Sequence, residues 1–374
     1  MGQKENKVIA FIKKEAVLCA ALLLAVISSL FIKPSVNYIT YLDYRVLVLL
    51  FCLMLVVAGF KNLGIFQLLG EKLCSLVHTT RGLTFVLVNL CFFASMLITN
   101  DVSLITFIPF TLSVYAMVGC EKVLIPVVVL ETIAANLGSM LTPVGNPQNL
   151  LLYSASEMSM GDFILHMLPL TCASYVVIAV CIFFIPDQHI ILHGNQSQDT
   201  KKWLNVSFVV YCILFLICLG NVTHLIQSYW AVGLIVAVTI FIVNRRLFTQ
   251  VDYSLLMTFV GFFIFIGNMK QIPLINEWLQ GIIKGNELLV GIVSSQIISN
   301  VPAAMLLSGF TTDYKQLLYG VNIGGLGTLI ASMASLISYR FFSRTYQEQK
   351  GRYFRVFTIY NVVLLVLLYV VACI

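Results

Sequence analysis

The chain has 374 residues, of which 60% are hydrophobic and only 10% are charged, and its net charge is +6. A soluble domain needs about 25% charged residues to cover its surface. The composition therefore excludes a soluble protein and predicts that most of the surface faces the lipid bilayer. The basic residues lie between apolar segments, where they orient membrane spans, so the positive charge does not indicate a nucleic-acid partner.

Apolar segments long enough to cross a bilayer as a helix, which takes about 20 residues, follow one another along the chain. The first comes after the lysine-rich segment 4–14 and is followed by Lys33-Pro34, with no convincing cleavage site before it. We therefore expect a retained N-terminal helix rather than a signal peptide. The predicted spans are 15–32, 45–60, 123–150, 163–185, 203–220, 229–243, 254–269, 316–339 and 355–373.

Two further apolar regions, 82–118 and 288–312, are each interrupted by a polar tip. The two arms of the second region would each rise only about 17 Å as helices, which is too short to cross about 30 Å of hydrocarbon. We therefore predict that 288–312 is a re-entrant hairpin, which enters and leaves the membrane on one side. Because 82–118 shares the tip chemistry, we predict a second re-entrant hairpin there.

The distribution of Lys and Arg supports one orientation of these segments. With the N-terminus in the cytoplasm, the predicted inside loops 61–81, 186–202, 244–253 and 340–355 all carry basic residues. The short outside loops 151–162 and 221–228 carry none. The sequence thus predicts an all-α, multi-pass protein of the cell membrane with a cytoplasmic N-terminus and a C-terminus outside.

The chain also contains an internal repeat. Residues 43–63 and 252–272 align at one constant offset, pairing Asp43 with Asp252, Tyr44 with Tyr253 and Lys61 with Lys270. Each segment leads into one hairpin, with the tip Thr99-Asn100-Asp101 in the first half and Ser299-Asn300-Val301-Pro302 in the second. Further on, Asn136-Leu-Gly138 matches Asn322-Ile-Gly324, and a threonine follows six residues after each asparagine, at Thr142 and Thr328.

In the predicted orientation, 45–60 runs inward and 254–269 runs outward, so the two repeats are inverted. Inverted repeats with interrupted helices at the midplane are common in secondary transporters. We predict an N-terminal helix in 1–40, a first repeat in 41–185, connecting helices in 186–250 and a second, inverted repeat in 251–374.

The hairpin tips are predicted to bind ions. At each tip one helix ends and another begins, so the tip offers unpaired N–H groups to an anion and carbonyl oxygens to a cation. The alternative interpretation is that Asn100, Ser299 and Asn300 only cap helices.

Two segments, 138–149 and 322–328, are predicted to interrupt spans. The first has two glycines and two prolines, and the second has three glycines, residues that break or weaken helical hydrogen bonding. Backbone exposed in this way must face protein or a wet cavity. Close helix packing is the alternative role for the glycines of the second segment.

Two acids lie within apolar regions, where an ionisable side chain is by default a functional hypothesis. Asp101 could ligate Na⁺ or carry a coupling proton, or it could be a first-turn acid favoured by the helix dipole. Glu131 could belong to the site or could lie solvated near the end of its span. Enzyme signatures are absent, and without a Walker A motif ATP does not drive the chain directly. The ten cysteines have neither CxxC spacing nor a zinc or disulfide framework.

These motifs resemble those of the ion transporter superfamily over nearly the whole chain from about residue 40. Ser299-Asn300 resembles the Ser-Asn-Thr tips of carboxylate symporters, Asn100-Asp101 looks more like the arsenite permeases, and Thr142–Asn149 resembles an element found across the group. The resemblance implies paired scaffold and transport domains, an elevator-like movement and a homodimer. This chain has Val301-Pro302 where the symporters have Thr, a departure that leaves sodium ligation and carboxylate specificity open.

We therefore expect a secondary transporter, not an enzyme, for a small anion such as citrate or another di- or tricarboxylate, coupled to Na⁺ or H⁺. The alternative is an arsenite or antimonite efflux permease driven by the proton motive force. No cofactor or metal is expected other than Na⁺ as a candidate coupling ion, with Asp101, Asn100 and Asn300 as coupling residues. The predicted substrate-binding residues are Thr99, Asn100, Asn136, Gly138, Thr142, Gly145, Asn146, Ser299, Asn300, Asn322, Gly324 and Thr328.

Overall fold

The computed structural model describes residues 15–65, 71–72, 74, 77–190 and 206–374. The lysine-rich segment 4–14 and the pair Lys201 and Lys202, which support the predicted orientation, lie outside the described residues. Within the described part the chain folds into helices, and the only β-type pairing there is an isolated antiparallel bridge between Thr79 and His189.

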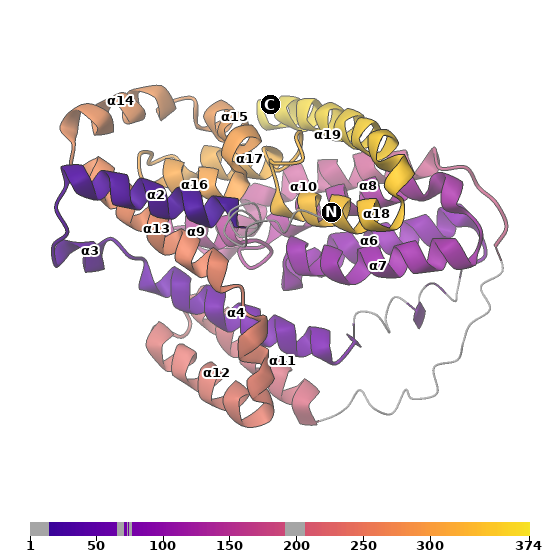
Figure 1. Cartoon of the computed structure of the whole chain (residues 1–374), viewed down its shortest axis with the longest axis horizontal. Helices are drawn as coiled ribbons and strands as arrows, with labels where there is room; N and C mark the ends of the chain where they lie inside the picture. The colour runs from indigo at the N-terminus through magenta and orange to yellow at the C-terminus, as the bar shows by residue number, and fades with distance from the viewer. Residues whose placement is uncertain (1–14, 66–70, 73, 75–76, 191–205) are drawn as a thin grey trace, which may run out of the picture.

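The helices follow the apolar segments of the sequence closely (Figure 1). The first half contains α2 (Ala16–Phe31), α3 (Asn37–Thr40), α4 (Tyr44–Asn62), α6 (Thr80–Ile98), α7 (Asn100–Met117), α8 (Leu124–Gly138), α9 (Pro147–Ala155) and α10 (Met160–Phe183). The second half contains α11 (Val206–Val222), α12 (Tyr229–Asn244), α13 (Tyr253–Lys270), α14 (Pro273–Ile283), α15 (Glu287–Ile298), α16 (Asn300–Ser308), α17 (Tyr314–Ile323), α18 (Met333–Thr345) and α19 (Lys350–Ala372). Short 3-10 turns are η1 (Glu121–Val123), η2 (Ser139–Leu141), η4 (Arg245–Gln250) and η5 (Gln347–Gln349).

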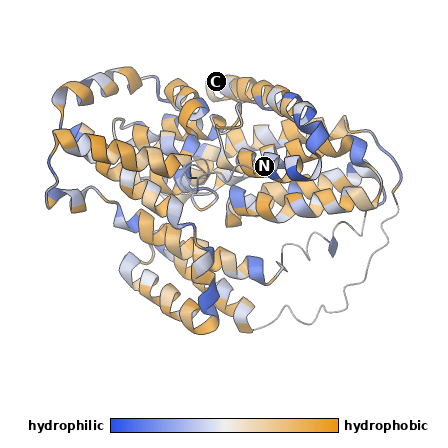
Figure 2. Cartoon of the chain, in the orientation of Figure 1, coloured by the Kyte–Doolittle hydropathy of each residue, from blue (hydrophilic) through white to orange (hydrophobic). Residues whose placement is uncertain are grey.

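The outer surface of the helices is apolar, as a membrane protein requires. Figure 2 shows hydrophobic residues along most helices, while hydrophilic residues gather mainly at helix ends and connections. Large side chains such as Leu216, Phe241 and Phe183 are exposed although they are apolar. Within the described residues, seven helices are long and apolar enough to cross a membrane. The chain is therefore a multi-pass membrane protein.

Helix α8 lies at the centre of the molecule. Each of its residues except Pro126 is buried, whereas other candidate spans keep lipid-facing sides. It packs against α6, α7, α10, α18 and α19. A helix that is covered on all sides belongs to a core, so the elements around α8 share one central partner.

The aligned aspartates of the two halves cap equivalent helices. Asp43 Oδ1 accepts a hydrogen bond from the Val46 N–H at 3.0 Å at the start of α4. Asp252 Oδ1 accepts one from the Leu255 N–H at 2.9 Å at the start of α13. An N-cap side chain satisfies a backbone donor that the helix itself leaves unpaired, which accounts for the shared Asp-Tyr pair in the sequence.

Two of the predicted spans are interrupted at the predicted places. Segment 123–150 forms α8, η2 and α9, with an irregular stretch at 142–146, and segment 316–339 forms α17 and α18 around an irregular stretch at 324–332. We call 138–146, which includes the last residue of α8 and the turn η2, the first break, and we call 324–332 the second break. In each of the two regions that were predicted as hairpins, two consecutive helices pack against each other, α6 with α7 and α15 with α16.

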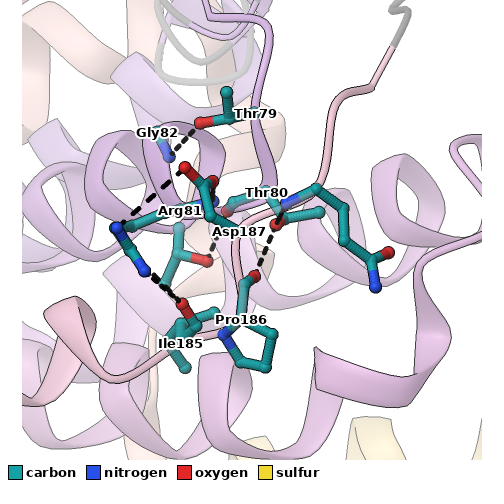
Figure 3. Close-up of polar contacts among 9 residues, drawn as sticks. Thr79, Thr80, Arg81, Gly82, Ile185, Pro186 and Asp187 are labelled. Atoms are coloured by element: carbon teal, nitrogen blue, oxygen red, sulfur yellow. Dashed lines mark hydrogen bonds and ion pairs between the residues drawn. The ribbon is translucent and has the colours of Figure 1, made fainter.

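The base of the first hairpin is fixed to the segment that follows α10 (Figure 3). The Thr80 hydroxyl donates to the Pro186 carbonyl at 2.7 Å, and the Arg81 guanidinium donates to the Ile185 carbonyl and lies 4.0 Å from the Asp187 carboxylate. Arg81 also stacks over the Phe183 ring. The start of α6 and the end of α10 therefore behave as one unit.

Candidate functional site

Both hairpin tips have the same unusual backbone conformation. Thr99 has φ 73° and ψ 152°, and Ser299 has φ 75° and ψ 152°. Residues other than glycine rarely adopt positive φ, and such a conformation costs on the order of 1–3 kcal/mol unless its surroundings enforce it. The same strained conformation at two aligned positions indicates that the surroundings of both tips hold the backbone in the same geometry.

Each tip donates a backbone hydrogen bond to the break in its own half. The Asn100 N–H donates to the Gly145 carbonyl at 3.2 Å, and the Asn300 N–H donates to the Ala331 carbonyl at 2.9 Å. Neither α7 nor α16 has a side-chain cap bond from its N-cap residue. The tips are therefore held by the breaks, in addition to any capping by the asparagine side chains.

Contacts along the rest of each break correspond in the same way. A Cβ added to Gly138 would lie 2.8 Å from the Ser95 hydroxyl, and one added to Gly324 would lie 2.6 Å from the Ser295 hydroxyl. Thr142 donates its hydroxyl to the Met96 carbonyl. Thr328, which is exposed, donates to the Gln296 carbonyl at 3.2 Å. The residue numbers of equivalent positions in the two halves differ by one constant value within the hairpins and by another constant value within the breaks.

The first central asparagine joins its own tip to the second break. Asn136 Oδ1 accepts from Asn100 Nδ2 at 3.0 Å and from the Ser332 hydroxyl at 2.9 Å, while Asn136 Nδ2 donates to the Ser335 hydroxyl at 3.3 Å. All four side chains are buried. A buried amide that makes three such bonds fixes the position of its partners, because leaving one unpaired costs about 1–3 kcal/mol.

The second central asparagine makes the reciprocal contact with the first break. Asn322 Oδ1 accepts from Asn146 Nδ2 at 3.2 Å, and Asn322 Nδ2 donates to Asn149 Oδ1 at 2.7 Å. Asn146 and Asn149 correspond in position to Ser332 and Ser335. The two halves therefore exchange equivalent hydrogen bonds at the middle of the molecule, where both tips and both breaks meet.

Amide groups occupy carbonyl oxygens of both breaks. Asn149 Nδ2 donates to the carbonyls of Met140 and Thr142, both at 3.1 Å. In the second break, Gln296 Nε2 donates to the carbonyls of Gly324 at 2.9 Å and Leu326 at 3.0 Å. The carbonyls of the first break thus receive their donor from α9, which follows the break, and those of the second break receive it from the hairpin helix α15.

The predicted site residues thus lie together, but sequence reasoning missed several of their partners. Gln296, Ser332 and Ser335 were not predicted. Asn146 and Ser332 each lie ten residues after the central asparagine of their half, and Asn149 and Ser335 each lie thirteen residues after it. Continuing the alignment of Asn136 with Asn322 would therefore have found both pairs. Gln296 gives no such signal, because its counterpart is Met96.

The two acids have different surroundings. Asp101 is half-buried in the first turn of α7, its N–H donates to Asn100 Oδ1 at 2.9 Å, and its carboxylate has no hydrogen-bond partner within the described ranges. Glu131 is fully buried on α8, so the solvated position considered for it is wrong. Among the described residues, no three His, Cys, Asp or Glu side chains gather as metal ligands. A cation at this site would rely on carbonyl, amide and single carboxylate oxygens.

Comparison of the sequence with known proteins identifies its family. The citrate transporter family, CitMHS, matches residues 8–313. The chain is 33% identical over 304 residues to the inner membrane protein YbiR of Escherichia coli, covering 80% of both chains. It is 33% identical over 305 residues to an uncharacterized transporter of Methanocaldococcus jannaschii, covering 80% of this chain and 81% of the relative.

A more distant relative extends the similarity toward mycobacteria. The 46 kDa membrane protein of Mycobacterium leprae is 22% identical over 342 residues, covering 80% of this chain and 78% of the relative. The family match spans both hairpin tips and most of the helices that surround them. The chain therefore belongs to the citrate transporter family of membrane transport proteins.

Proposed function

We propose that the chain is a secondary active transporter of a small anion, of the di- or tricarboxylate class such as citrate, coupled to Na⁺ or H⁺. The observation that carries this proposal is the meeting of two equivalent hairpin tips with two breaks at the centre of the molecule. Irregular backbone at membrane depth is costly unless it is buried in protein or lines a cavity. A purely structural role therefore gives no reason for two breaks and two polar tips to gather at one place.

The substrate site in this proposal uses helix ends and amides in place of arginine. The N-termini of α7 and α16 point a positive dipole end at the centre, which favours a carboxylate. Asn100 and Asn300 supply amides beside these ends, and Asp101 supplies a carboxylate for a coupling cation or proton. The description of the matched family favours a carboxylate substrate over arsenite or antimonite.

The membrane arrangement is part of the same proposal. Helices α15 and α16 have 12 and 9 residues, so each rises less than about 20 Å and the pair enters and leaves on one side. In Figure 1, α6 and α7 extend from the middle of the molecule toward the right, whereas α16 lies to the left of the middle. This opposed placement supports inverted repeats. An elevator-type movement and a homodimer belong to the proposal through the family resemblance, and a cytoplasmic N-terminus in the cell membrane belongs to it through the distribution of basic residues.

Uptake of radiolabelled citrate into proteoliposomes tests the proposal. We expect wild-type protein to accumulate citrate and the double variant Asn100→Ala plus Asn300→Ala to lose uptake. The matched control is Asn89→Ala, because Asn89 lies on α6 outside the centre and its amide only bonds Phe85 and Tyr175. Uptake that survives the double substitution would falsify the assigned site, and a metalloid-resistance assay tests the efflux alternative.

A further inference from the structure

A row of buried hydroxyl groups runs between the two arms of the first hairpin. Thr80 and Thr84 of α6 and Tyr115 of α7 are fully buried. The Thr84 hydroxyl lies 2.7 Å from the Tyr115 hydroxyl, and the Tyr115 hydroxyl donates to the Thr80 carbonyl at 3.2 Å. Polar groups at this density are not needed to pack an apolar hairpin, since Leu or Val would fill the same space without a hydrogen-bond requirement.

The outer end of this row is at the base of the hairpin shown in Figure 3. The Thr80 hydroxyl contacts the Pro186 carbonyl and accepts from the Gln188 N–H at 2.9 Å. The neighbouring Asp187 side chain is 41% exposed. The outer end of the row therefore lies beside a half-exposed acidic loop, although the Thr80 side chain itself is buried.

The inner end of the row is Glu131 of α8. The Thr111 hydroxyl, one helical turn before Tyr115 on α7, donates to Glu131 Oε1 at 2.6 Å. Glu131 Oε2 is buried and has no hydrogen-bond partner in the described part of the chain. A carboxyl oxygen without a partner in an apolar core is an exception that calls for a functional explanation.

Among the residues that the structure describes, no positively charged group is found to interact with Glu131. The titratable groups there that interact with it are the thiols of Cys91 on α6 and of Cys74, and the phenols of Tyr115 on α7 and Tyr353 on α19. All of these groups are neutral near pH 7. An ionised carboxylate with one hydrogen bond and no counter-ion would cost several kcal/mol in this setting, so Glu131 holds a proton in the conformation described.

Polar atoms continue from Glu131 toward the tip. The Cys91 thiol faces the Glu131 carboxyl group, and the Cys91 carbonyl accepts from the Ser103 hydroxyl at 3.3 Å. The Ser103 N–H donates to the carbonyl of Thr99, the strained tip residue, at 3.1 Å. Glu131 thus lies between the exposed base of the hairpin and the centre where both tips meet.

The second half lacks this row. At the positions that correspond to Ser103 and Glu131 it has Ala303 and Leu317, and α16 ends at Ser308, before it could supply a counterpart of Tyr115. Thr311 does correspond to Thr111, and it donates at 3.0 Å to Glu287 Oε1. Glu287, however, is the first residue of α15, where the helix dipole stabilises a negative charge.

We propose that Glu131 is a proton-binding residue of the transport cycle, reached from the base of the first hairpin through the hydroxyls of Thr80, Thr84, Tyr115 and Thr111. This inference rests on the proposed secondary transport and names the group that would exchange the coupling proton. The Thr84 and Tyr115 hydroxyls are hydrogen-bonded to each other, so each can pass on its proton and take one from the group before it, and only Glu131 changes charge. The Thr80 hydroxyl bonds Pro186 and Gln188, and the Thr84 hydroxyl bonds the Thr80 carbonyl, so an entering water has to link these two hydroxyls. A rotation of the Thr111 hydroxyl or an entering water bridges the turn between Tyr115 and Thr111.

Infrared difference spectroscopy on the full-length protein in lipid tests the proposal without any substrate. We expect a protonated-carboxyl band at neutral pH in wild type, loss of that band in Glu131→Gln, and retention in the matched control Glu287→Gln. Spectra of wild type and Glu131→Gln that coincide in this region at every pH would overturn the proposal. If Glu131→Gln does not fold, Thr111→Val takes its place, with a shift of the band expected and an unshifted band counting against the proposal.

A transport arm separates this inference from the proposed function. In proteoliposomes with radiolabelled citrate, Glu131→Gln should keep citrate–citrate exchange but lose the acceleration of uptake by an inward proton gradient. Full acceleration in this variant overturns the role of Glu131 while the transport function stands. If wild type moves no citrate at all, the proposed substrate class fails, and the infrared result still decides whether Glu131 binds a proton.

Discussion

At the residue scale, small side chains let each hairpin approach its break, and asparagines then hold the contact. Gly138 lies so close to α6 that an added Cβ would be 2.1 Å from the Phe92 carbonyl oxygen. Its backbone is ordinary right-handed helix, with φ −65° and ψ −44°. Glycine is therefore required there by space and not by backbone conformation.

Substitution of this glycine should destabilise the protein. We expect Gly138→Ala to lower the free energy of unfolding by about 1–3 kcal/mol, since the contacting atom belongs to backbone and cannot rotate away. The control is Gly281→Ala in α14, where an added Cβ meets nothing within 4 Å and the higher helix propensity of alanine should stabilise by about 0.5–1 kcal/mol. Thermal unfolding in detergent compares the two, and equal midpoints would contradict the packing argument.

The residues of the site differ in how far the sequence could predict them. Asn100, Asn136 and Asn322 were predictable because an amide in an apolar segment must find a partner, and because the pattern occurs in both halves. Gln296 was not, since its hydrogen bonds go to carbonyls that become available only when the second break has formed. Full burial of Glu131 likewise depends on helices that surround α8 from distant parts of the chain.

At the scale of elements, the hairpins differ in length although their tips match. Helices α6 and α7 have 19 and 18 residues, enough to rise about 27 Å, so their length alone does not settle whether they span the membrane. Helices α15 and α16 are too short for that. The prediction that the second hairpin is re-entrant therefore rests on the length of its arms, whereas for the first hairpin it rests on the shared tip.

Cysteine accessibility tests the side from which each hairpin enters. On a background in which the ten native cysteines are replaced, single cysteines at Asn286 and Thr312 flank the second hairpin, and those at His78 and Gly119 flank the first. All four positions are exposed. We expect a membrane-impermeant thiol reagent applied outside cells to label the Asn286 and Thr312 variants only.

The control for orientation is a cysteine at Arg245, which is exposed and lies in a predicted cytoplasmic loop. It should stay unlabelled in intact cells and react in inverted vesicles, together with the His78 and Gly119 variants. If the two flanks of one hairpin are labelled from opposite sides, that hairpin spans the membrane and the re-entrant interpretation is wrong for it.

At the scale of the whole molecule, the helices fall into two groups. Helix α4 packs against α11 and α12, and Figure 1 shows these three set apart below the rest. The first hairpin, α10, α18 and α19 pack around α8, and the second hairpin joins this group through α17 and α9. Helix α13 packs mainly against α2 and also contacts α4, so we count it with α4. Contacts between the groups then include α4 with α9 and α13 with α16, and it is these contacts that an elevator-type movement would have to change.

A cross-link between the two groups should therefore stop transport, and one within a group should not. The Ser154 hydroxyl of α9 lies 3.4 Å from Asp43 Oδ2 at the start of α4, so the variant Asp43→Cys plus Ser154→Cys places a pair of thiols across the boundary. Within the lower group, Arg45 Nη1 lies 3.0 Å from His224 Nδ1, which makes Arg45→Cys plus His224→Cys the matched pair. On the cysteine-free background, we expect a short bifunctional thiol reagent to abolish citrate uptake in the first variant.

Two controls show whether the loss of uptake comes from blocked movement: the uptake of the single variants, and its recovery when the cross-link is cleaved. Asp43 caps α4, so its replacement alone should cost about 1 kcal/mol of stability but leave uptake measurable before cross-linking. A reducible reagent should restore uptake on reduction in the first variant, and the Arg45–His224 pair should transport in both states. Undiminished uptake with a fully cross-linked Asp43–Ser154 pair would show that the groups do not move past each other at α4 and α9, because a rigid link of that length leaves no room for the displacement of a helix group across the membrane.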